Sequence, residues 1–225
     1  MAGVEEMKLV IVLLTYNRLD YALKTLRSTI ENLKFSGEIS VHIADDGSSE
    51  EYRDTLKFLA GGYTHIKGVS VSNSQRGGYG KNYNLALQTV HLYADYVLPL
   101  EDDWVLVQEL DIDRFIPALD NINIGCLRLG YIGFTQELRG RVHYRDSEHY
   151  LIFDSNSPEP HVFAGHPRLE TIQWEREVGP WPEGLRPGAT EFAVAHLPAA
   201  RQRVAWPMSI RPSGNYFVHI GAERT

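Results

Sequence analysis

The feature that most constrains the fold is an unbroken apolar run at residues 9–14, close to the start of the chain. A strand that is apolar at every position has to be buried on both faces, which is typical of a parallel sheet covered by helices. Three further strand patterns follow at residues 39–43, 66–71 and 96–100, and the third of the four is the weakest. The spacing of these runs leaves room for a helix between each strand and the next.

Helical patterns fill those intervals. Asn17 is a suitable N-cap for a first helix, whose apolar positions recur every three or four residues. These positions are Leu19, Leu23, Leu26, Ile30 and Leu33. Ser48 and Glu51 have capping-box spacing, which predicts a second, short helix that ends at the Gly-Gly pair 61–62. A third helical pattern spans about residues 81–93.

Strands that alternate with helices imply right-handed crossovers and a parallel sheet. We therefore expect an α/β fold with a mostly parallel central sheet flanked by helices. Neither an internal repeat nor a low-complexity linker interrupts the chain. The length suits a single compact domain with a sizeable core.

The second half of the chain has a different pattern. Short apolar segments at 126–134 are followed by a stretch rich in proline and glycine at 157–212, and by a strand-like end at 216–221. Between the first two lies a local basic patch made of Arg139, Arg141, His143 and Arg145. We expect mostly loops with one or two short helices, forming a substrate-facing cap on the sheet.

Composition and charge narrow the classes of function. The hydrophobic fraction of 43% and charged fraction of 23% exclude disorder and a coiled coil. The net charge of −7 argues against a broad electrostatic grip on nucleic acid, although a local basic groove remains open.

Cellular setting can be inferred from the cysteine and the N-terminal pattern. The only cysteine, Cys126, cannot form an internal disulfide, which favours a reducing compartment, so we expect a cytoplasmic protein. The apolar run at 9–14 is far shorter than the about twenty residues of a membrane span. Glu5 and Glu6 precede it where a signal peptide has basic residues, so we expect neither a signal peptide nor an integral membrane segment.

Polar side chains follow all four strands of the predicted sheet. Ligands of open parallel sheets bind outside the carboxyl ends of the strands, so these residues should converge on one site. They are Thr15, Tyr16, Asn17 and Arg18; Asp45, Asp46, Gly47 and Ser48; Asn73, Ser74, Gln75, Arg76, Gly77 and Gly78; and Glu101, Asp102 and Asp103. This convergence is the main argument from the residues for a binding site.

The kind of ligand follows partly from motifs that are missing. No G-x-G-x-x-G follows the first strand, which argues against a dinucleotide site. A P-loop would need glycine at 75 and Ser or Thr at 82, but the chain has Gln75 and Asn82. The three consecutive carboxylates at 101–103 are costly to crowd together unless a cation neutralises them.

Mg²⁺ or Mn²⁺ is the natural partner of such carboxylates, and it usually brings a phosphate with it. Arg76, with glycines behind it, can meet the same phosphates through two parallel hydrogen bonds. The alternative is that the acidic strand end merely caps the next turn.

Four segments of the first half resemble, in order and spacing, the signatures of family 2-like glycosyltransferases with the GT-A fold. They are residues 10–18, 42–49, 73–86 and 100–104. The resemblance implies a Rossmann-like nucleotide-binding sheet. It also implies a nucleotide-sugar (donor) binding half at 1–106 and an acceptor-side half at 107–225 within one compact domain.

The resemblance also implies roles for residues of the donor half. Thr15 and Asn17 would line the base pocket, and Asp45 would accept a hydrogen bond from the imide of the base. Arg76 would contact the base or the diphosphate.

The acidic motif would serve the ribose and the metal. Asp102 would contact the ribose, and Asp103 would bind the metal that bridges the diphosphate. The commoner form of the motif is D-x-D-D, whereas this chain has Leu100 and Glu101 ahead of the pair, so the division of labour between Glu101 and Asp102 stays open.

The second half resembles the family less tightly. Residues 188–192 are similar to the acidic motif near the acceptor, which implies that Glu191 is the catalytic base. Residues 218–221 resemble a C-terminal His-x-Gly, which implies that His219 is a metal ligand. The alternatives are an exposed Glu191 in the first turn of a helix and a structural His219 in a strand.

Other residues are open to two interpretations. Trp174 and Trp181 can stack on a sugar or pack in the core, and the arginines of the basic patch can bind an anionic acceptor or form a solvated surface. Residues 163–168 correspond only loosely to the acceptor-side loop of the family.

The resulting hypothesis is a metal-dependent glycosyltransferase that moves a sugar from a nucleoside-diphosphate sugar, with UDP favoured, to an acceptor hydroxyl with inversion. The expected cofactor is Mn²⁺ or Mg²⁺. The acceptor stays open between a protein side chain, a glycan, a lipid carrier and a modified nucleic-acid base, and so does the oligomeric state. The alternatives are a sugar nucleotidyltransferase and a non-catalytic module that binds sugar nucleotides or glycans.

Overall fold

The computed structural model describes residues 6–121, 124–130, 139–145, 148–158, 162–186, 188–208 and 216–221. In its first half, four strands pair in parallel in the order β4-β3-β1-β5. Their bounds are β1 (Lys8–Thr15), β3 (Glu38–Asp45), β4 (Ile66–Asn73) and β5 (Tyr96–Glu101). This confirms the predicted parallel α/β arrangement.

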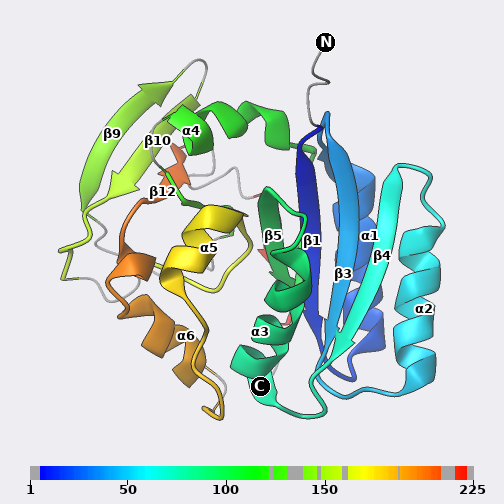
Figure 1. The fold of residues 1–225 in the computed structure, drawn as a ribbon. Coiled ribbons are helices and arrows are strands. Elements are labelled where there is room, and N and C mark those ends of the chain that lie inside the picture. The colour runs from blue at the N-terminus through cyan, green and yellow to red at the C-terminus, as the bar shows by residue number, and fades with distance from the viewer. Residues whose placement is uncertain are drawn as a thin grey trace.

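Three helices connect these strands. They are α1 (Leu19–Asn32), α2 (Glu50–Gly61) and α3 (Gly78–Val90). Helices α1 and α2 cover one face of the sheet and α3 covers the other (Figure 1). The sheet order reverses between α2 and α3, so right-handed crossovers require this change of face.

The sheet continues into the second half of the chain, where we expected mostly loops. Five more strands follow β5 in the order β11-β8-β12-β10-β9, giving a nine-stranded sheet. Their bounds are β8 (Cys126–Arg128), β9 (Gly140–Arg145), β10 (Glu148–Phe153), β11 (Arg168–Thr171) and β12 (Val204–Pro207). Most are only three or four residues long, and proline- and glycine-rich segments separate them, which hid them in the sequence.

The remaining elements are short. Two small sheets pair β13 (Phe217–His219) with β6 (Trp104–Leu106), and β2 (Leu33–Lys34) with β7 (Leu110–Asp111). The other helices are α4 (Ile116–Asn121), α5 (Ile172–Val178) and α6 (Ala189–Ala195), with 3₁₀ turns at Ile112–Arg114 and Ala199–Arg201. None of the helices in the described ranges is long and apolar enough to cross a membrane.

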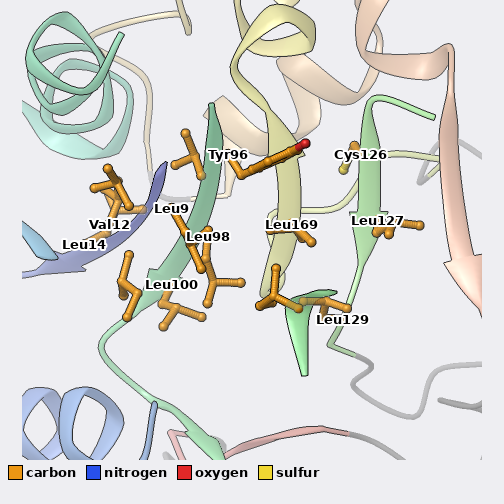
Figure 2. Close-up of a cluster of buried hydrophobic side chains, with 14 of the residues drawn as sticks. Leu9, Val12, Leu14, Tyr96, Leu98, Leu100, Cys126, Leu127, Leu129 and Leu169 are labelled. Carbon is orange, nitrogen blue, oxygen red and sulfur yellow. The ribbon is translucent and has the colours of Figure 1, made fainter. Parts of the chain in front are cut away.

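One apolar layer runs across both halves of the sheet. Leu9 of β1, Leu98 of β5, Leu169 of β11 and Leu127 of β8 lie in one cluster of side chains and are fully buried (Figure 2). Cys126, next to Leu127 on β8, is a free buried thiol. The core therefore crosses the boundary at residue 106 without interruption.

Two predicted helix caps are wrong. Arg18, not Asn17, is the residue before α1, and Asn17 has a positive φ of 47°. Ser49, not Ser48, caps α2, because its hydroxyl accepts from the Tyr52 amide at 3.2 Å. The Ser48 hydroxyl instead accepts a hydrogen bond from the Asn17 amide at 2.9 Å. The two residues predicted as caps therefore connect the loops that follow β1 and β3.

Candidate active site

A cavity of about 650 Å³ opens at the carboxyl ends of the parallel strands. Its wall combines residues from all four predicted loops with two from the second half of the chain. These are Leu14, Thr15, Tyr16, Asn17, Arg18, Asp46, Arg76, Gly78, Tyr79, Asn82, Glu101, Asp102, Leu185 and Gly188. The convergence expected from the strand ends is therefore present, and α6 with the loop before it approaches from the other side.

Tyr16 and Arg76 form one wall of the cavity. The Arg76 guanidinium carbon lies 3.8 Å from the centre of the Tyr16 ring, in a cation–π contact. The backbone of Arg76 has a positive φ of 67°, and its amide donates to the Asp46 carbonyl at 3.1 Å. A Cβ at Gly47 would lie 3.1 Å from that amide nitrogen, so glycine allows the two loops to approach.

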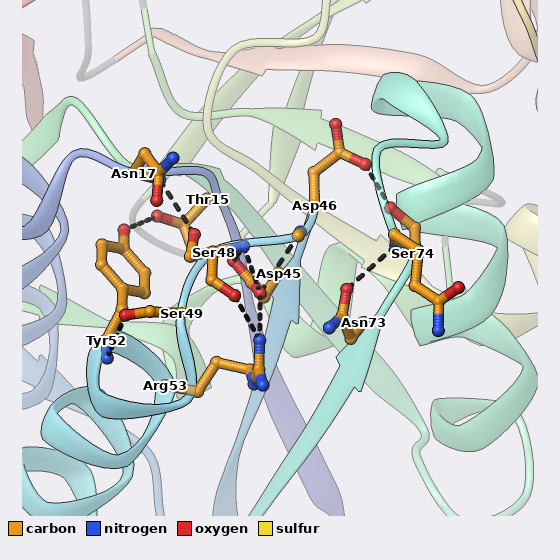
Figure 3. A network of polar contacts seen from close by, with 12 residues as sticks. Thr15, Asn17, Asp45, Asp46, Ser48, Ser49, Tyr52, Arg53, Asn73 and Ser74 are labelled. Atoms are coloured by element: carbon orange, nitrogen blue, oxygen red, sulfur yellow. Dashed lines mark hydrogen bonds and ion pairs between the residues drawn. The ribbon is translucent and has the colours of Figure 1, made fainter.

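The two adjacent aspartates that follow β3 have side chains in different surroundings. Asp45 is fully buried, and its carboxylate accepts from the Ser48 amide at 2.9 Å and pairs with Arg53 at 3.1 Å (Figure 3). Asp45 therefore holds the loop and lies outside the cavity wall. Asp46 lines the cavity instead, where it accepts from the Gly78 amide at 3.1 Å and from the Ser74 hydroxyl.

Thr15 connects β1 to the acidic motif. Its hydroxyl donates to Asp102 Oδ2 at 3.0 Å and is hydrogen-bonded to the Tyr52 hydroxyl. The backbone carbonyl of Asp102 accepts from the Thr25 hydroxyl at 2.8 Å, so α1 also fixes this position. Asn17 lies exposed at the cavity mouth.

Glu101 and Asp102 have raised pKa values, mainly because they are buried. Burial, followed by the charges of Asp103, Glu191 and Asp102, raises the pKa of Glu101 to about 8. Burial also raises the pKa of Asp102 to about 6, against the opposing effects of Arg18 and the Thr15 hydrogen bond. A cation bound here would relieve this repulsion.

Arg18 is a residue of the cavity wall for which the sequence analysis predicted no role. Its Nη1 lies 2.8 Å from Asp102 Oδ1, and its Nη2 lies 2.7 Å from Asp103 Oδ2. The guanidinium also lies over the Tyr21 ring, 4.6 Å from its centre. The available signal was a basic residue three positions past β1, at the same sheet edge as the three carboxylates.

Asp103 and His219 lie together, as a shared metal site requires. His219 Nε2 is 3.4 Å from Asp103 Oδ2, because β13 pairs with β6 directly after the acidic motif. The other oxygen of Asp103, Oδ1, is buried and has no hydrogen-bond partner among the residues that the structure describes.

The donor set fits a hard divalent cation. The carboxylate oxygen suits Mg²⁺ or Mn²⁺, which take further ligands from phosphates and water, and the imidazole nitrogen favours Mn²⁺ over the harder Mg²⁺. Within the described ranges, no group of three or more His, Cys, Asp or Glu could hold a metal alone. A cation at this site would therefore depend on ligands from the bound nucleotide.

Glu191 reaches the same site from the second half of the chain. It lies in the first turn of α6, and its Oε1 accepts from the Gly165 amide at 2.6 Å. Its charge contributes to the raised pKa of the neighbouring Glu101, but Glu191 itself does not form part of the cavity wall. Gly188, at a positive φ of 78°, begins the helix at the cavity wall.

Several other residues considered from the sequence lie away from the cavity wall. Trp174 and Trp181 are only 1% and 2% exposed and pack in the core, which excludes direct sugar stacking in this conformation. Arg139, Arg141 and Arg145 lie on or next to β9, the last strand in the sheet order, and none lines the cavity. His42 is buried between the Ser70 and Ser72 hydroxyls and is structural.

Four parallel strands with a polar cavity at their carboxyl ends form the arrangement in which open α/β proteins bind nucleotides and other ligands. Residues 10–169 match the model of glycosyl transferase family 2, and the chain belongs to this family. The resemblance seen in its motifs is thereby confirmed. No curated protein matches the chain significantly by sequence.

Solved structures of glycosyltransferases share the fold. S. aureus TarS 1-349 in complex with UDP superimposes with a TM-score of 0.67 at 17% identity, over 89% of this chain and 57% of TarS 1-349. GalNAc-T7 with UDP, GalNAc and Mn²⁺ superimposes with a TM-score of 0.65 at 15% identity, over 91% of this chain and 43% of GalNAc-T7.

A third neighbour carries a different nucleotide. The mannosyltransferase PcManGT from Pyrobaculum calidifontis, in complex with GDP-Man and Mn²⁺, gives a TM-score of 0.57 at 13% identity, over 94% and 59% of the two chains. The present chain thus spans between about two fifths and three fifths of the length of these three neighbours.

Proposed function

We propose that the chain transfers a sugar from a nucleoside-diphosphate sugar, with UDP favoured, to an acceptor hydroxyl with inversion at the anomeric carbon. One observation carries this proposal. Asp102 and the adjacent Asp103 are buried at the carboxyl edge of the sheet, where Asp102 lines the cavity, and α6, which carries Glu191, begins at the same cavity wall with Gly188. The single buried cysteine supports a reducing, cytoplasmic setting.

The donor would lie along the cavity with its base toward Tyr16. Thr15, Asn17 and the Tyr16–Arg76 wall are the groups available to the base. Asp46 lines the cavity and Asp45 does not, so Asp46 would be the residue that accepts a hydrogen bond from the base imide. Asp102 would then meet the ribose, and Arg76 the diphosphate.

The metal would be held by Asp103 Oδ1 and His219, with diphosphate oxygens completing its shell. Bound there, Mn²⁺ or Mg²⁺ would offset the negative charge that develops on the leaving diphosphate. The UDP and Mn²⁺ bound to GalNAc-T7, and the GDP-Man and Mn²⁺ bound to PcManGT, support this assignment.

Glu191 is the proposed general base. Its carboxylate would take the proton of the acceptor hydroxyl, whose oxygen attacks the anomeric carbon from the face opposite the diphosphate. The bond from that carbon to the diphosphate oxygen breaks, and the diphosphate leaves with the electron pair. The Gly165 amide, 2.6 Å from Oε1, orients the carboxylate for this step.

The test measures release of the nucleoside diphosphate from candidate donor sugars, with and without Mn²⁺. Asp103→Asn should abolish transfer with the fold intact. Glu191→Gln should lower kcat by about a hundred- to ten-thousand-fold with UDP affinity nearly unchanged. Glu50→Gln removes an exposed carboxylate from α2 and is the matched control, for which wild-type turnover is expected.

Each alternative has a distinct outcome. Wild-type turnover in Asp103→Asn would contradict the metal assignment, and a large loss of UDP binding in Glu191→Gln would move that residue to the donor site. Pyrophosphate release from UTP and a sugar phosphate would indicate a nucleotidyltransferase. Binding of UDP with Mn²⁺, without donor hydrolysis or transfer to any acceptor, would indicate a non-catalytic module.

A further inference from the structure

Arg18 bridges the two aspartates at the heart of the proposed metal site. Asp102 and Asp103 are 4% and 7% exposed, and each pairs with a different nitrogen of the guanidinium, at 2.8 and 2.7 Å. A planar guanidinium can serve two carboxylates at once through separate nitrogens, which a lysine ammonium cannot do in the same geometry.

The surroundings hold Arg18 in this position. The Tyr21 ring stacks on the guanidinium, and the backbone around Gly221 closes over the ion pairs. A Cβ at Gly221 would lie 2.1 Å from Asp103 Oδ2 and 3.0 Å from Arg18 Nη2, so only glycine leaves room for the pair. The arrangement is a packed part of the site and not a loose surface contact.

This position conflicts with metal binding by the same carboxylate. A divalent cation on Asp103 would lie beside a guanidinium already paired with the other oxygen of that residue. The two positive charges repel each other at such a separation, and repulsion is strong in a site this poorly exposed to water. The cation therefore has to weaken or displace the Arg18 pairing.

We propose that Arg18 is an internal counter-ion of the acidic pair, which a divalent cation displaces and the diphosphate of the donor then takes up. This inference rests on the proposed function, because it needs Asp103 as a metal ligand. Arg18 lines the cavity, so its guanidinium can turn from the carboxylates to phosphate oxygens, which it matches in geometry.

A thermodynamic coupling follows from this exchange. Mn²⁺ alone would have to break ion pairs without replacement, whereas Mn²⁺ with UDP supplies the guanidinium with a new anionic partner. Metal and nucleotide should therefore strengthen each other's binding, and the strengthening factor is the same in both directions. Arg18 would make the site selective for the metal–nucleotide complex over the free cation.

The experiment measures Mn²⁺ binding by the electron paramagnetic resonance signal of the free ion, with and without UDP. Arg18→Gln removes the charge and keeps an amide that can donate to one carboxylate. We expect it to bind Mn²⁺ alone about tenfold more tightly than the wild type, and the UDP–Mn²⁺ coupling factor to fall by about the same amount.

Two further variants complete the set. Arg18→Lys keeps the charge but loses the bridge, so we expect an increase in Mn²⁺ affinity smaller than that of Arg18→Gln. If Arg18→Gln does not fold, Arg18→Lys is the variant that tests the counter-ion role. Arg27→Gln removes the same charge from an exposed position of α1 and should bind Mn²⁺ as the wild type does.

The outcomes separate this inference from the proposed function. Mn²⁺ affinity that is unchanged or weaker in the Arg18 variants, with normal UDP coupling, overturns the counter-ion role alone. An equal gain of Mn²⁺ affinity in Arg27→Gln would mean that the loss of any positive charge has this effect. That result would also overturn the counter-ion role of Arg18. Failure of the wild type to bind Mn²⁺ even with UDP contradicts the metal-dependent function, and this inference with it.

Discussion

At the scale of single residues, the acidic pair depends on a glycine far away in the chain. A Cβ at Gly221 would lie 2.1 Å from Asp103 Oδ2, a distance that no side chain can tolerate. We expect Gly221→Ala to push the carboxylate aside and to lower turnover by about a hundredfold, since a displacement of about 1 Å at a reacting group has that effect. Steady-state kinetics and Mn²⁺ titration measure it.

Gly61→Ala is the matched control for that substitution. Within the described part of the chain, no atom lies within 4 Å of the place that a Cβ at Gly61 would take, and its φ is not positive. Its alanine variant should keep wild-type turnover. Equal activity of the two variants would mean that the Gly221 backbone can move away from Asp103 at little cost.

His42 is a buried residue that should make stability depend on pH. Burial lowers its pKa from 6.5 to about 4, while both ring nitrogens contact serine hydroxyls. Below pH 6.5, His42 is protonated in the unfolded chain, whereas in the folded chain it stays neutral down to about pH 4. Stability from this residue is therefore present above pH 6.5 and is lost as the pH falls toward 4, by up to about 3 kcal/mol.

His42→Asn removes the titrating group and tests this expectation. The variant should be less stable near neutral pH, because it loses part of the packing and one hydrogen bond. Its free energy of unfolding, measured by urea denaturation between pH 7.5 and 4.5, should fall less steeply than that of the wild type. Parallel curves would assign the acid sensitivity to other groups.

At the scale of elements, β11, α5 and α3 meet in a buried ionic network. Arg168 pairs with Glu170 on the same face of β11, and its Nη1 donates to the Gly165 carbonyl at 3.2 Å. The Tyr83 hydroxyl of α3 lies 2.9 Å from Glu175 of α5 and 3.1 Å from Glu170.

One guanidinium cannot neutralise two carboxylates. Burial and the neighbouring Glu170 raise the pKa of Glu175 well above its ordinary value, which favours its neutral form beside the Arg168–Glu170 ion pair. The network joins these elements behind the cavity. It also supports the Gly165 peptide, which holds Glu191.

Arg168→Met should destabilise the protein by about 3–5 kcal/mol, because it leaves Glu170 buried without a counter-ion. The double variant Arg168→Met/Glu170→Gln removes both charges and should recover much of this loss. Urea denaturation of the wild type, both single variants and the double variant measures the coupling. A double variant as unstable as the sum of the single ones would contradict the ion-pair interpretation.

At the scale of the whole molecule, the two halves of the chain share one sheet. β5 pairs with β1 on one side and with β11 on the other, and the apolar layer of Figure 2 continues across that boundary. Separating the halves would expose this layer and the unpaired edge of β5 to water.

We therefore expect a single cooperative unfolding transition. Far-UV circular dichroism reports mainly on α1, α2 and α3 of the first half, whereas three of the four buried tryptophans, Trp174, Trp181 and Trp206, lie in the second. The two signals should give the same midpoint in urea. Midpoints that differ would indicate two units that unfold separately.

The sequence by itself determined the parallel half of the sheet and the edge at which the site lies. An apolar run such as residues 9–14 can only be buried on both faces, and the polar residues after each strand must then meet at one edge. Thr15, Arg76 and the acidic motif could be named for this reason. Their order and spacing also identified the family, which the match over residues 10–169 confirms.

Only the tertiary structure decided where these side chains lie relative to the cavity. The choice between Asp45 and Asp46 depends on which way each side chain points from one turn, and their adjacency carries no such information. The short strands of the second half owe their existence to pairing with distant partners, which local patterns do not record.

The contacts of Arg18 with Asp102 and Asp103, and the close approach of Gly221, join parts of the chain that are far apart in sequence. Such contacts arise when strands and helices pack, so their geometry follows from the folded sheet and not from any local spacing.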